Sequence, residues 1–365
     1  MNIPRPQLIA QLFASVRSGN ALLVGDPGIG KSWAMRGLRA FAQAQHVPVE
    51  LIAIDGIYAE DEAELNAYVG WQHGLLGYLR TRAATPQNKG LLLFDAFDAA
   101  RSDNKRNLFL RLIRRCITEL RDEWDIMVSV RTFDAQKSRE LIRLFPATDA
   151  AGVAQGKVLS IPALNEQELS VALNSDAKLA ALYQRCAPEL RAILHVPFNL
   201  WLLEQIAAST SDADVSDLYT ATELLTLFWQ CRVHQEGSRD ENEAILRRAV
   251  SDQVSSKQLV SLRTDVFVTQ LAKAWDQMFS ANVLEEDRGT KNGVKFTHNI
   301  LFDFAVHNCW SQMSLCDWLR SWPKTPLGRC SCVRALFIIL KISFAVDQSG
   351  SGATSSKLAH LSIRL

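Results

Sequence analysis

The chain has no long hydrophobic run. Its longest strongly apolar segment, residues 335–346, spans twelve residues and includes Lys341, whereas a helix that crosses a bilayer needs about 20 apolar residues. The N-terminus lacks the basic start and following apolar stretch that a secretory signal requires. We therefore expect a cytoplasmic protein with no membrane partner.

An excess of charge of one sign is also absent. Forty Lys and Arg against 39 Asp and Glu leave a formal net charge of +1 over 365 residues. The overall charge therefore favours neither nucleic acid nor an anionic membrane as a partner. The composition, 48% hydrophobic and 22% charged, is that of a globular protein, and the length suggests two or three domains.

Cysteines are few and follow no recognisable framework. The seven are an odd, scattered set, at positions 116, 186, 231, 309, 316, 330 and 332. This pattern indicates reduced thiols rather than disulfides. Cys330 and Cys332 form a C-x-C pair, but no second Cys or His pair stands at zinc-finger spacing from it. The cysteines therefore predict no metal site.

The first 160 residues alternate between short apolar segments and helical stretches. An amphipathic helix is predicted over residues 7–17, and further helical stretches include 32–45 and 107–120. The strand candidates are residues 21–24, 49–54, 91–95, 126–130 and 157–161. Such alternation is typical of βαβ units in a parallel sheet covered on both faces. We predict an α/β domain over residues 1–161.

Beyond Pro162 the pattern becomes mainly helical. One hairpin candidate interrupts it, with strands 281–286 and 294–297 joined through an Asn292-Gly293 turn. The helical stretches are residues 166–173, 177–186, 197–207, 218–234, 263–279 and 298–310. We predict a helical lid region over residues 162–262 and a winged-helix-like domain over residues 263–322.

Residues 323–365 differ in composition from the rest. They contain six Lys or Arg, a single acidic residue, Asp347, and seven serines. Two interpretations stay open: a basic, flexible, Ser-rich tail, or a truncated or frame-shifted end. No internal repeat is found along the chain.

One motif carries a specific chemistry. Residues Gly25, Asp26, Pro27, Gly28, Ile29, Gly30, Lys31 and Ser32 match the phosphate-loop pattern G-x-x-x-x-G-K-[ST] in full. Glycines let backbone N–H groups surround an anion, and the following helix adds its positive end. Lys31 would reach the β and γ phosphates, and Ser32 would bind Mg²⁺. We predict a nucleotide site at these residues and Trp33.

A second strand supplies the expected metal-binding carboxylate. Residues 90–95 form an apolar strand that ends at Asp95, 64 residues after Lys31. An Asp at a strand end is commonly a loop cap, but beside a phosphate loop it predicts a metal ligand. Asp98 is the candidate that polarises the attacking water. The alternative for Asp98 is a surface carboxylate.

A third strand, residues 126–130, is followed by Arg131 at the sheet edge where open α/β folds bind ligands. We predict that Arg131 reads the γ-phosphate or a neighbouring element. The alternative is a solvated Arg131 paired with Asp134 or Glu140.

Together these residues resemble the P-loop ATPases of the AAA-like and STAND group, including NACHT-type proteins. The strand that ends Leu-Leu-Leu-Phe-Asp95-Ala96-Phe97-Asp98 resembles their Walker B motif, and Ser129-Val130-Arg131 resembles their sensor strand. The resemblance covers residues 1 to about 320. It implies a five-stranded core of order 5-1-4-3-2, then a helical lid and a winged helix.

Two further matches come from the second half. Residues 195–200 are similar to the lid motif whose proline, here Pro197, packs near the nucleotide base. Thr297-His298-Asn299 resembles the winged-helix motif in which a histidine contacts the β-phosphate of ADP. By its residue type alone, His298 also suits a helix cap or a core position.

The chain departs from the resemblance in ways that affect catalysis. Asp98-Ala99 stands where NACHT proteins often have Asp-Glu, so slow hydrolysis, or none, is expected. Asn299 replaces the Asp that often follows the histidine. Large STAND proteins also carry C-terminal sensor repeats and often an N-terminal effector, whereas only about six residues precede the first predicted helix here and no repeat follows. We therefore expect the switch without its sensor.

The favoured function is a Mg²⁺-dependent, ATP-binding and ATP-hydrolysing signalling switch. The alternative is a non-catalytic module, gated by ADP and ATP, that binds a protein partner or self-associates in the ATP state. A DNA-handling ATPase is less favoured, because Arg288 and Lys291 at the hairpin turn are matched by neighbouring acidic residues. ATP is preferred over GTP because no N-K-x-D motif is present, together with the resemblance.

Overall fold

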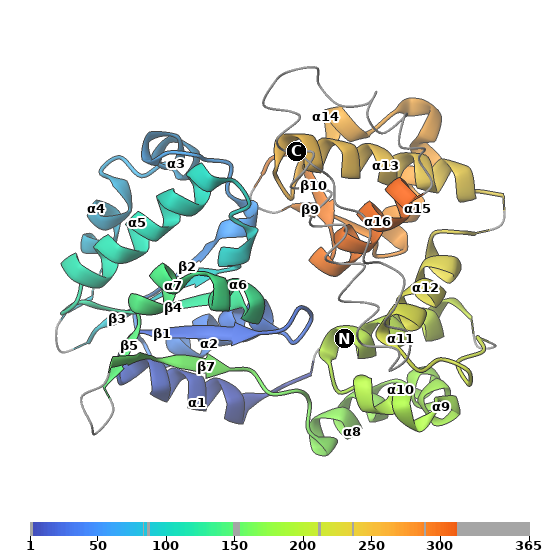
Figure 1. Cartoon of the computed structure of the whole chain (residues 1–365), viewed down its shortest axis with the longest axis horizontal. Coiled ribbons are helices and arrows are strands. Elements are labelled where there is room, and N and C mark those ends of the chain that lie inside the picture. Colours follow the sequence, from blue (N-terminus) through green and yellow to red (C-terminus); the bar gives the residue numbers. More distant parts are fainter. Residues whose placement is uncertain are drawn as a thin grey trace, which may run out of the picture.

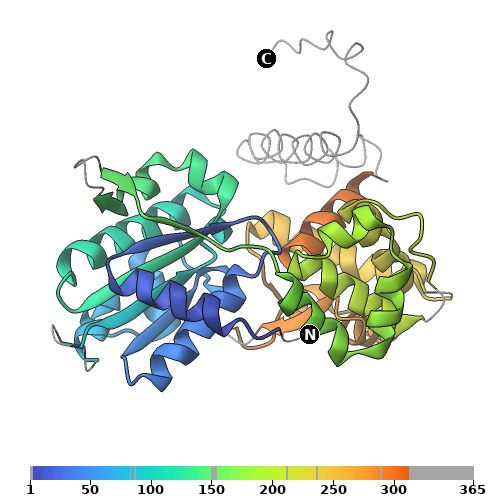
Figure 2. The same cartoon turned by 90° about the horizontal axis from the view of Figure 1, so that it is seen from below.

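The computed structural model describes residues 3–311 except 83, 86–87, 149–153, 211–212, 236 and 288–289. The predicted tail, residues 323–365, lies outside the described residues. The rest forms two halves that lie side by side in both views: an α/β half and a C-terminal half that is mainly helical (Figures 1 and 2). Among the described residues, no helix is long and apolar enough to cross a membrane.

The α/β half is built on a five-stranded parallel sheet. Its strands are β1 (Ala21–Gly25), β2 (Val49–Ala53), β3 (Gly90–Asp95), β4 (Trp124–Arg131) and β7 (Val158–Ser160), in the order β2-β3-β4-β1-β7. With β7 as the fifth strand, this is the order 5-1-4-3-2 that the resemblance implied. The predicted P-loop NTPase type of core is confirmed. A short antiparallel pair, β5 (Pro146–Thr148) and β6 (Ala154–Gly156), was not predicted.

Helices cover both faces of this sheet. One face packs on α1 (Pro6–Arg17) and α2 (Lys31–Ala44), and the other on α3 (Glu62–Val69), α4 (Gly74–Arg80) and α5 (Asp103–Glu119). Alternate residues of β3 belong to the two cores: Leu91 and Leu93 to the first, Leu92 and Phe94 to the second. This follows from the period of two along a strand. The continuous apolar run in the sequence therefore marks a strand buried on both faces.

The C-terminal half contains helices and a small sheet. Its helices are α8 (Glu166–Ser175), α9 (Ala177–Arg185), α10 (Pro188–Ile193), α11 (Pro197–Ser209), α12 (Ala221–Arg232), α13 (Arg239–Ser256), α14 (Arg263–Val266), α15 (Ala272–Ser280) and α16 (Asn299–Ser311). Its antiparallel sheet has the order β8-β10-β9, formed by β8 (Ser261–Leu262), β9 (Leu284–Asp287) and β10 (Gly293–Phe296). The predicted hairpin is β9 and β10.

Two helical predictions in this half were inaccurate. The predicted helix over 263–279 is interrupted after Val266, because Phe267 and Val268 are extended. Helix α13 was not predicted, because its first turns are dominated by charged residues and it buries polar Asn242 and Gln253 beside its apolar residues. One hydrophobic core, with Leu203, Phe228 and Leu301 among its members, runs across the predicted boundary at 262/263. The domain boundaries stay predictions.

Candidate functional site

The phosphate loop connects β1 to α2. Gly28 and Gly30 have φ angles of 81° and 99°, a region that residues with a Cβ rarely adopt. Gly30 is the N-cap of α2 and offers no side-chain acceptor, and no acidic residue stands in the first turn. The N–H groups at the start of α2 are thus uncompensated by a cap or a carboxylate. This arrangement favours an anion at the loop.

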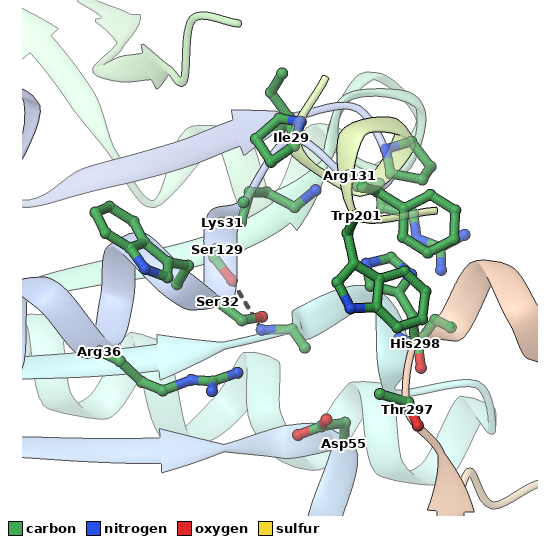
Figure 3. Close-up of a pocket in the computed structure, with 18 of the residues that line it drawn as sticks. Ile29, Lys31, Ser32, Arg36, Asp55, Ser129, Arg131, Trp201, Thr297 and His298 are labelled. Atoms are coloured by element: carbon green, nitrogen blue, oxygen red, sulfur yellow. Dashed lines mark hydrogen bonds between the residues drawn. The ribbon is translucent and has the colours of Figure 1, made fainter. Parts of the chain in front are cut away.

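A cavity of about 440 Å³ lies at this loop, between the two halves. Figure 3 shows Lys31 and Arg131 of the α/β half facing it together with Trp201 and His298 of the C-terminal half. The predicted site residues that line it are Pro27, Gly28, Ile29, Gly30, Lys31, Ser32, Trp33, Asp98, Arg131, Pro197 and His298. Gly25, Asp26 and Asp95 are outside its lining but bond to residues that line it.

Lys31 lies folded over the loop. Its Nζ donates to the carbonyl oxygens of Gly25 at 2.7 Å and Asp26 at 3.1 Å. Burial lowers the pKa of the Lys31 ammonium, and the nearby carboxylate of Asp98 opposes this effect. Lys31 thus supplies a partly buried cation beside the carboxylate predicted to act on water.

Asp95 is held by hydroxyl groups. The residue is 6% exposed. Ser129 Oγ donates to the Asp95 Oδ1 at 2.5 Å and accepts from the Ala96 N–H at 2.8 Å. Ser32 shares a side-chain hydrogen bond with Asp95. Burial raises the pKa of the Asp95 carboxyl, and the hydrogen bonds from Ser129 and Ser32 partly offset this rise. A hydroxyl and a carboxylate side by side are hard oxygen ligands, which suit Mg²⁺.

Asp98 and Arg131 form an ion pair inside the site. Asp98 Oδ2 lies 2.8 Å from Arg131 Nε, and the Asp98 side chain is 8% exposed. Asp98 is therefore not a surface carboxylate. The alternative pairing of Arg131 with Glu140 is wrong, because Glu140 pairs with Arg114.

The second partner of Arg131 comes from the C-terminal half. Its Nη1 lies 3.5 Å from Asp303 Oδ2 on α16. Burial would lower the pKa of the Arg131 guanidinium, but the carboxylates of Asp303 and Asp98 more than offset this and raise it. Asp134 contributes only at longer range. Arg131 therefore connects the sheet edge to α16.

His298 both caps α16 and faces the cavity. Its Nδ1 accepts a hydrogen bond from the Ile300 N–H at 3.1 Å. Burial, with the positive charges of Arg131 and Lys31, lowers the pKa of the His298 imidazole to about 3. The ring is therefore neutral near pH 7, and its proton lies on Nε2 because Nδ1 accepts. It can serve as a neutral donor beside the phosphate loop.

The first turn of α11 contacts the phosphate loop directly. Pro197 occupies the first turn, where its missing N–H leaves no bond unmade. The next residue, Phe198, donates its N–H to the Gly28 carbonyl at 3.2 Å. The Phe198 ring lies 4.2 Å from the His298 ring and 5.7 Å from the Trp201 ring, centroid to centroid. These rings give the cavity one aromatic wall.

Several cavity-lining residues were missed by sequence reasoning. They are Arg5, Arg36, Asp55, Ser129, Trp201 and Lys295. Arg36 stands one helical turn after Ser32, and Asp55 follows β2 at the edge where Asp95 ends β3, so local spacing contained a signal for both. Lys295 comes from the small C-terminal sheet, and no local pattern places it here.

No protein-family model and no curated protein sequence matches the chain. Solved structures with a similar arrangement include the Walker-type ATPase PABY2304 of Pyrococcus abyssi, with 13% identity, a TM-score of 0.38, and coverage of 84% of this chain and 96% of that chain. The Aeropyrum pernix Orc1 protein in complex with DNA has 14% identity, a TM-score of 0.38, and coverage of 84% and 93%.

A third similar structure is the Thermotoga maritima RuvB Holliday junction branch migration motor. It has 13% identity, a TM-score of 0.33, and coverage of 82% of this chain and 94% of that chain. Identities and TM-scores this low establish no function. The P-loop NTPase type of fold is assigned from the strand order and from the loop between β1 and α2.

Proposed function

We propose that this chain binds ATP with Mg²⁺ in the cavity, hydrolyses it slowly, and thereby switches how the C-terminal half is held on the α/β half. One observation carries the proposal: the phosphate loop, Asp98 and Arg131 share a single cavity with His298 and Pro197 from the other half. A ligand there touches both halves. Its chemical state can then bias their arrangement, provided that its contacts differ between the states.

Different residues would bind the phosphates, the base and the Mg²⁺ ion. The N-terminus of α2 and Lys31 hold the phosphates, and the aromatic wall of Phe198 and Trp201 offers an apolar surface to a base. Ser32 and Asp95 would hold Mg²⁺, Asp95 through water. When bound, this ion neutralises phosphate charge and orients the β and γ phosphates.

Slow turnover follows from the state of Asp98. A carboxylate that polarises water must accept a proton or a strong hydrogen bond from it. Asp98 is already paired with Arg131, whose Nε lies 2.8 Å from the Asp98 Oδ2, and the following residue is Ala99 rather than an acid. The Asp98 oxygen that faces Arg131 is therefore less available to an attacking water. Arg131 in turn would stabilise charge on the terminal phosphate.

The alternative is a non-catalytic module that retains ADP and binds a protein partner, or a second copy, after exchange for ATP. The neutral His298 donor at the loop favours this alternative, because a donor to the β-phosphate serves ADP as well as ATP. Catalysis would then be incidental. A switch in signalling is common to both alternatives.

The test is steady-state ATP hydrolysis with Mg²⁺, together with direct binding of ATP and ADP. Lys31→Ala should lose both, whereas Lys273→Ala, on the exposed face of α15, should retain both. ATP hydrolysis by the unaltered chain, together with its loss in Lys31→Ala, supports the proposal that the chain is an ATPase. Binding without turnover supports the non-catalytic alternative. Failure of the folded, unaltered chain to bind either nucleotide would refute both.

A further inference from the structure

Two arginines of the α/β half meet one carboxylate of the C-terminal half. Asp303 on α16 lies 3.5 Å from Arg131 Nη1 through its Oδ2, and 3.5 Å from Arg101 Nη2 through its Oδ1. The Arg101 guanidinium also stacks over the Phe302 ring at 4.9 Å from its centroid. Charged contacts therefore contribute to the attachment of this part of α16 to the α/β half.

Arg131 is shared between this attachment and the cavity. Its Nε forms an ion pair with Asp98, its Nη1 faces Asp303, and its side chain lines the same cavity as Lys31. The charge of Arg131 acts on both Lys31 and His298, so the guanidinium lies close to the phosphate loop. A terminal phosphate beside Lys31 would therefore come within reach of a cation that Asp303 already occupies.

We propose that Asp303 is a positioning residue that sets the preference between ATP and ADP by competing with the γ-phosphate for Arg131. This inference rests on the proposed function. Two anions that approach one guanidinium repel each other. ATP must weaken the contact between Arg131 and Asp303, whereas ADP, which lacks the γ-phosphate, leaves it in place.

The competition works in both directions. If the contact between Asp303 and Arg131 lowers the affinity for ATP relative to ADP, then ATP, relative to ADP, lowers the equilibrium constant for forming that contact by the same factor. His298, which lines the cavity, immediately precedes α16 and accepts a hydrogen bond from its first turn. Loosening α16 at Asp303 therefore also affects the helix that holds His298 at the phosphate loop. Asp303 thus connects the identity of the nucleotide to the arrangement of the halves.

The experiment compares affinities for a non-hydrolysable ATP analogue and for ADP, by calorimetry with Mg²⁺. Asp303→Asn keeps the shape and removes the charge, and it should shift the ratio of the two affinities toward the ATP analogue by about fivefold or more. Asp303→Glu, which keeps the charge, should stay nearer the unaltered ratio. The matched control Asp276→Asn, an exposed position on α15, should leave the ratio unchanged.

A second readout needs no turnover. Hydrogen exchange of the α16 amides in the unaltered chain should be faster with the ATP analogue than with ADP, and in nucleotide-free Asp303→Asn it should be faster than in the unaltered chain. An unchanged affinity ratio in folded Asp303→Asn, or equal α16 exchange with the two nucleotides, would overturn the inference alone. An unaltered chain that binds neither nucleotide would instead overturn the proposed function.

Discussion

The Phe198 N–H donates to the carbonyl oxygen of Gly28 at 3.2 Å, so the C-terminal half is bonded to the backbone of the phosphate loop itself. The contact is tight: a Cβ added to Gly28 would lie 2.6 Å from the Phe198 Cβ. Any displacement of the loop by a ligand therefore also shifts Phe198 at the start of α11. This relationship gives a direct route from the cavity to the other half.

Gly28→Ala should test that contact. Both Gly28→Ala and Gly70→Ala place a Cβ at a φ near +80°, but at Gly70 nothing lies within 4 Å. Both variants should lose about 1 to 2 kcal/mol to backbone strain, and only Gly28→Ala must also displace Phe198. We expect a larger fall in melting temperature and weaker ADP binding for Gly28→Ala. Equal losses in the two variants would show that the contact contributes little.

Ser129→Ala should weaken the predicted metal site. The variant removes the donor to Asp95 and leaves the Ala96 N–H without its acceptor, a loss of about 1 to 3 kcal/mol for a buried group. Without Ser129, the pKa of the already raised Asp95 carboxyl rises further. As pH falls, Mg²⁺-dependent nucleotide binding should therefore be lost at a higher pH than in the unaltered chain.

A titration of binding against pH at fixed Mg²⁺ measures this shift. Ser170→Ala, on the exposed side of α8, is the control and should titrate as the unaltered chain does. An unshifted midpoint in Ser129→Ala would show that Ser129 does not set the protonation of Asp95.

His298→Gln should make the fold less sensitive to acid. The pKa of His298 is about 3 in the folded protein and about 6.5 when unfolded, so the unfolded chain takes up this proton first. The stability associated with the neutral ring is present above pH 6.5 and is lost progressively as pH falls toward 3. Between pH 6.5 and 5 the loss should be on the order of 1 kcal/mol.

Urea unfolding at pH 7 and at pH 5 measures the effect as a difference within each protein. Glutamine keeps a donor but does not titrate, so this part of the pH dependence should disappear in His298→Gln. His46→Gln, at an exposed loop position, serves as the control. The same acid sensitivity in His298→Gln and the unaltered chain would mean that folding does not lower the pKa of His298.

Asp98→Asn should reduce catalysis without reducing the affinity for ATP. The change removes the ion pair with Arg131 at the centre of the site but retains a similar shape. We expect kcat to fall by about 100-fold or more, while the affinity for ATP is retained or increased because Arg131 gains freedom to meet the γ-phosphate. Single-turnover hydrolysis with separately measured ATP binding gives both quantities. Retained kcat would exclude Asp98 from the chemistry.

The sequence by itself determined the sheet and the loop. The strands around Asp95 and Arg131 are recognisable because strands buried on both faces are continuously apolar, and Lys31 and Ser32 follow from a contiguous motif. Both signals are local in the chain. The strand order also followed, once the resemblance supplied it.

Only the tertiary structure decided what the site residues do for one another. Asp303 lies 172 residues from Arg131 along the chain. Phe198 and Gly28 are likewise distant in sequence and come into contact only in the folded protein. Whether Asp98 is a surface carboxylate or the partner of Arg131, and whether His298 is charged, depends on burial and on distant charges. Periodicity and spacing report neighbours along the chain, whereas these properties arise from groups that meet in space.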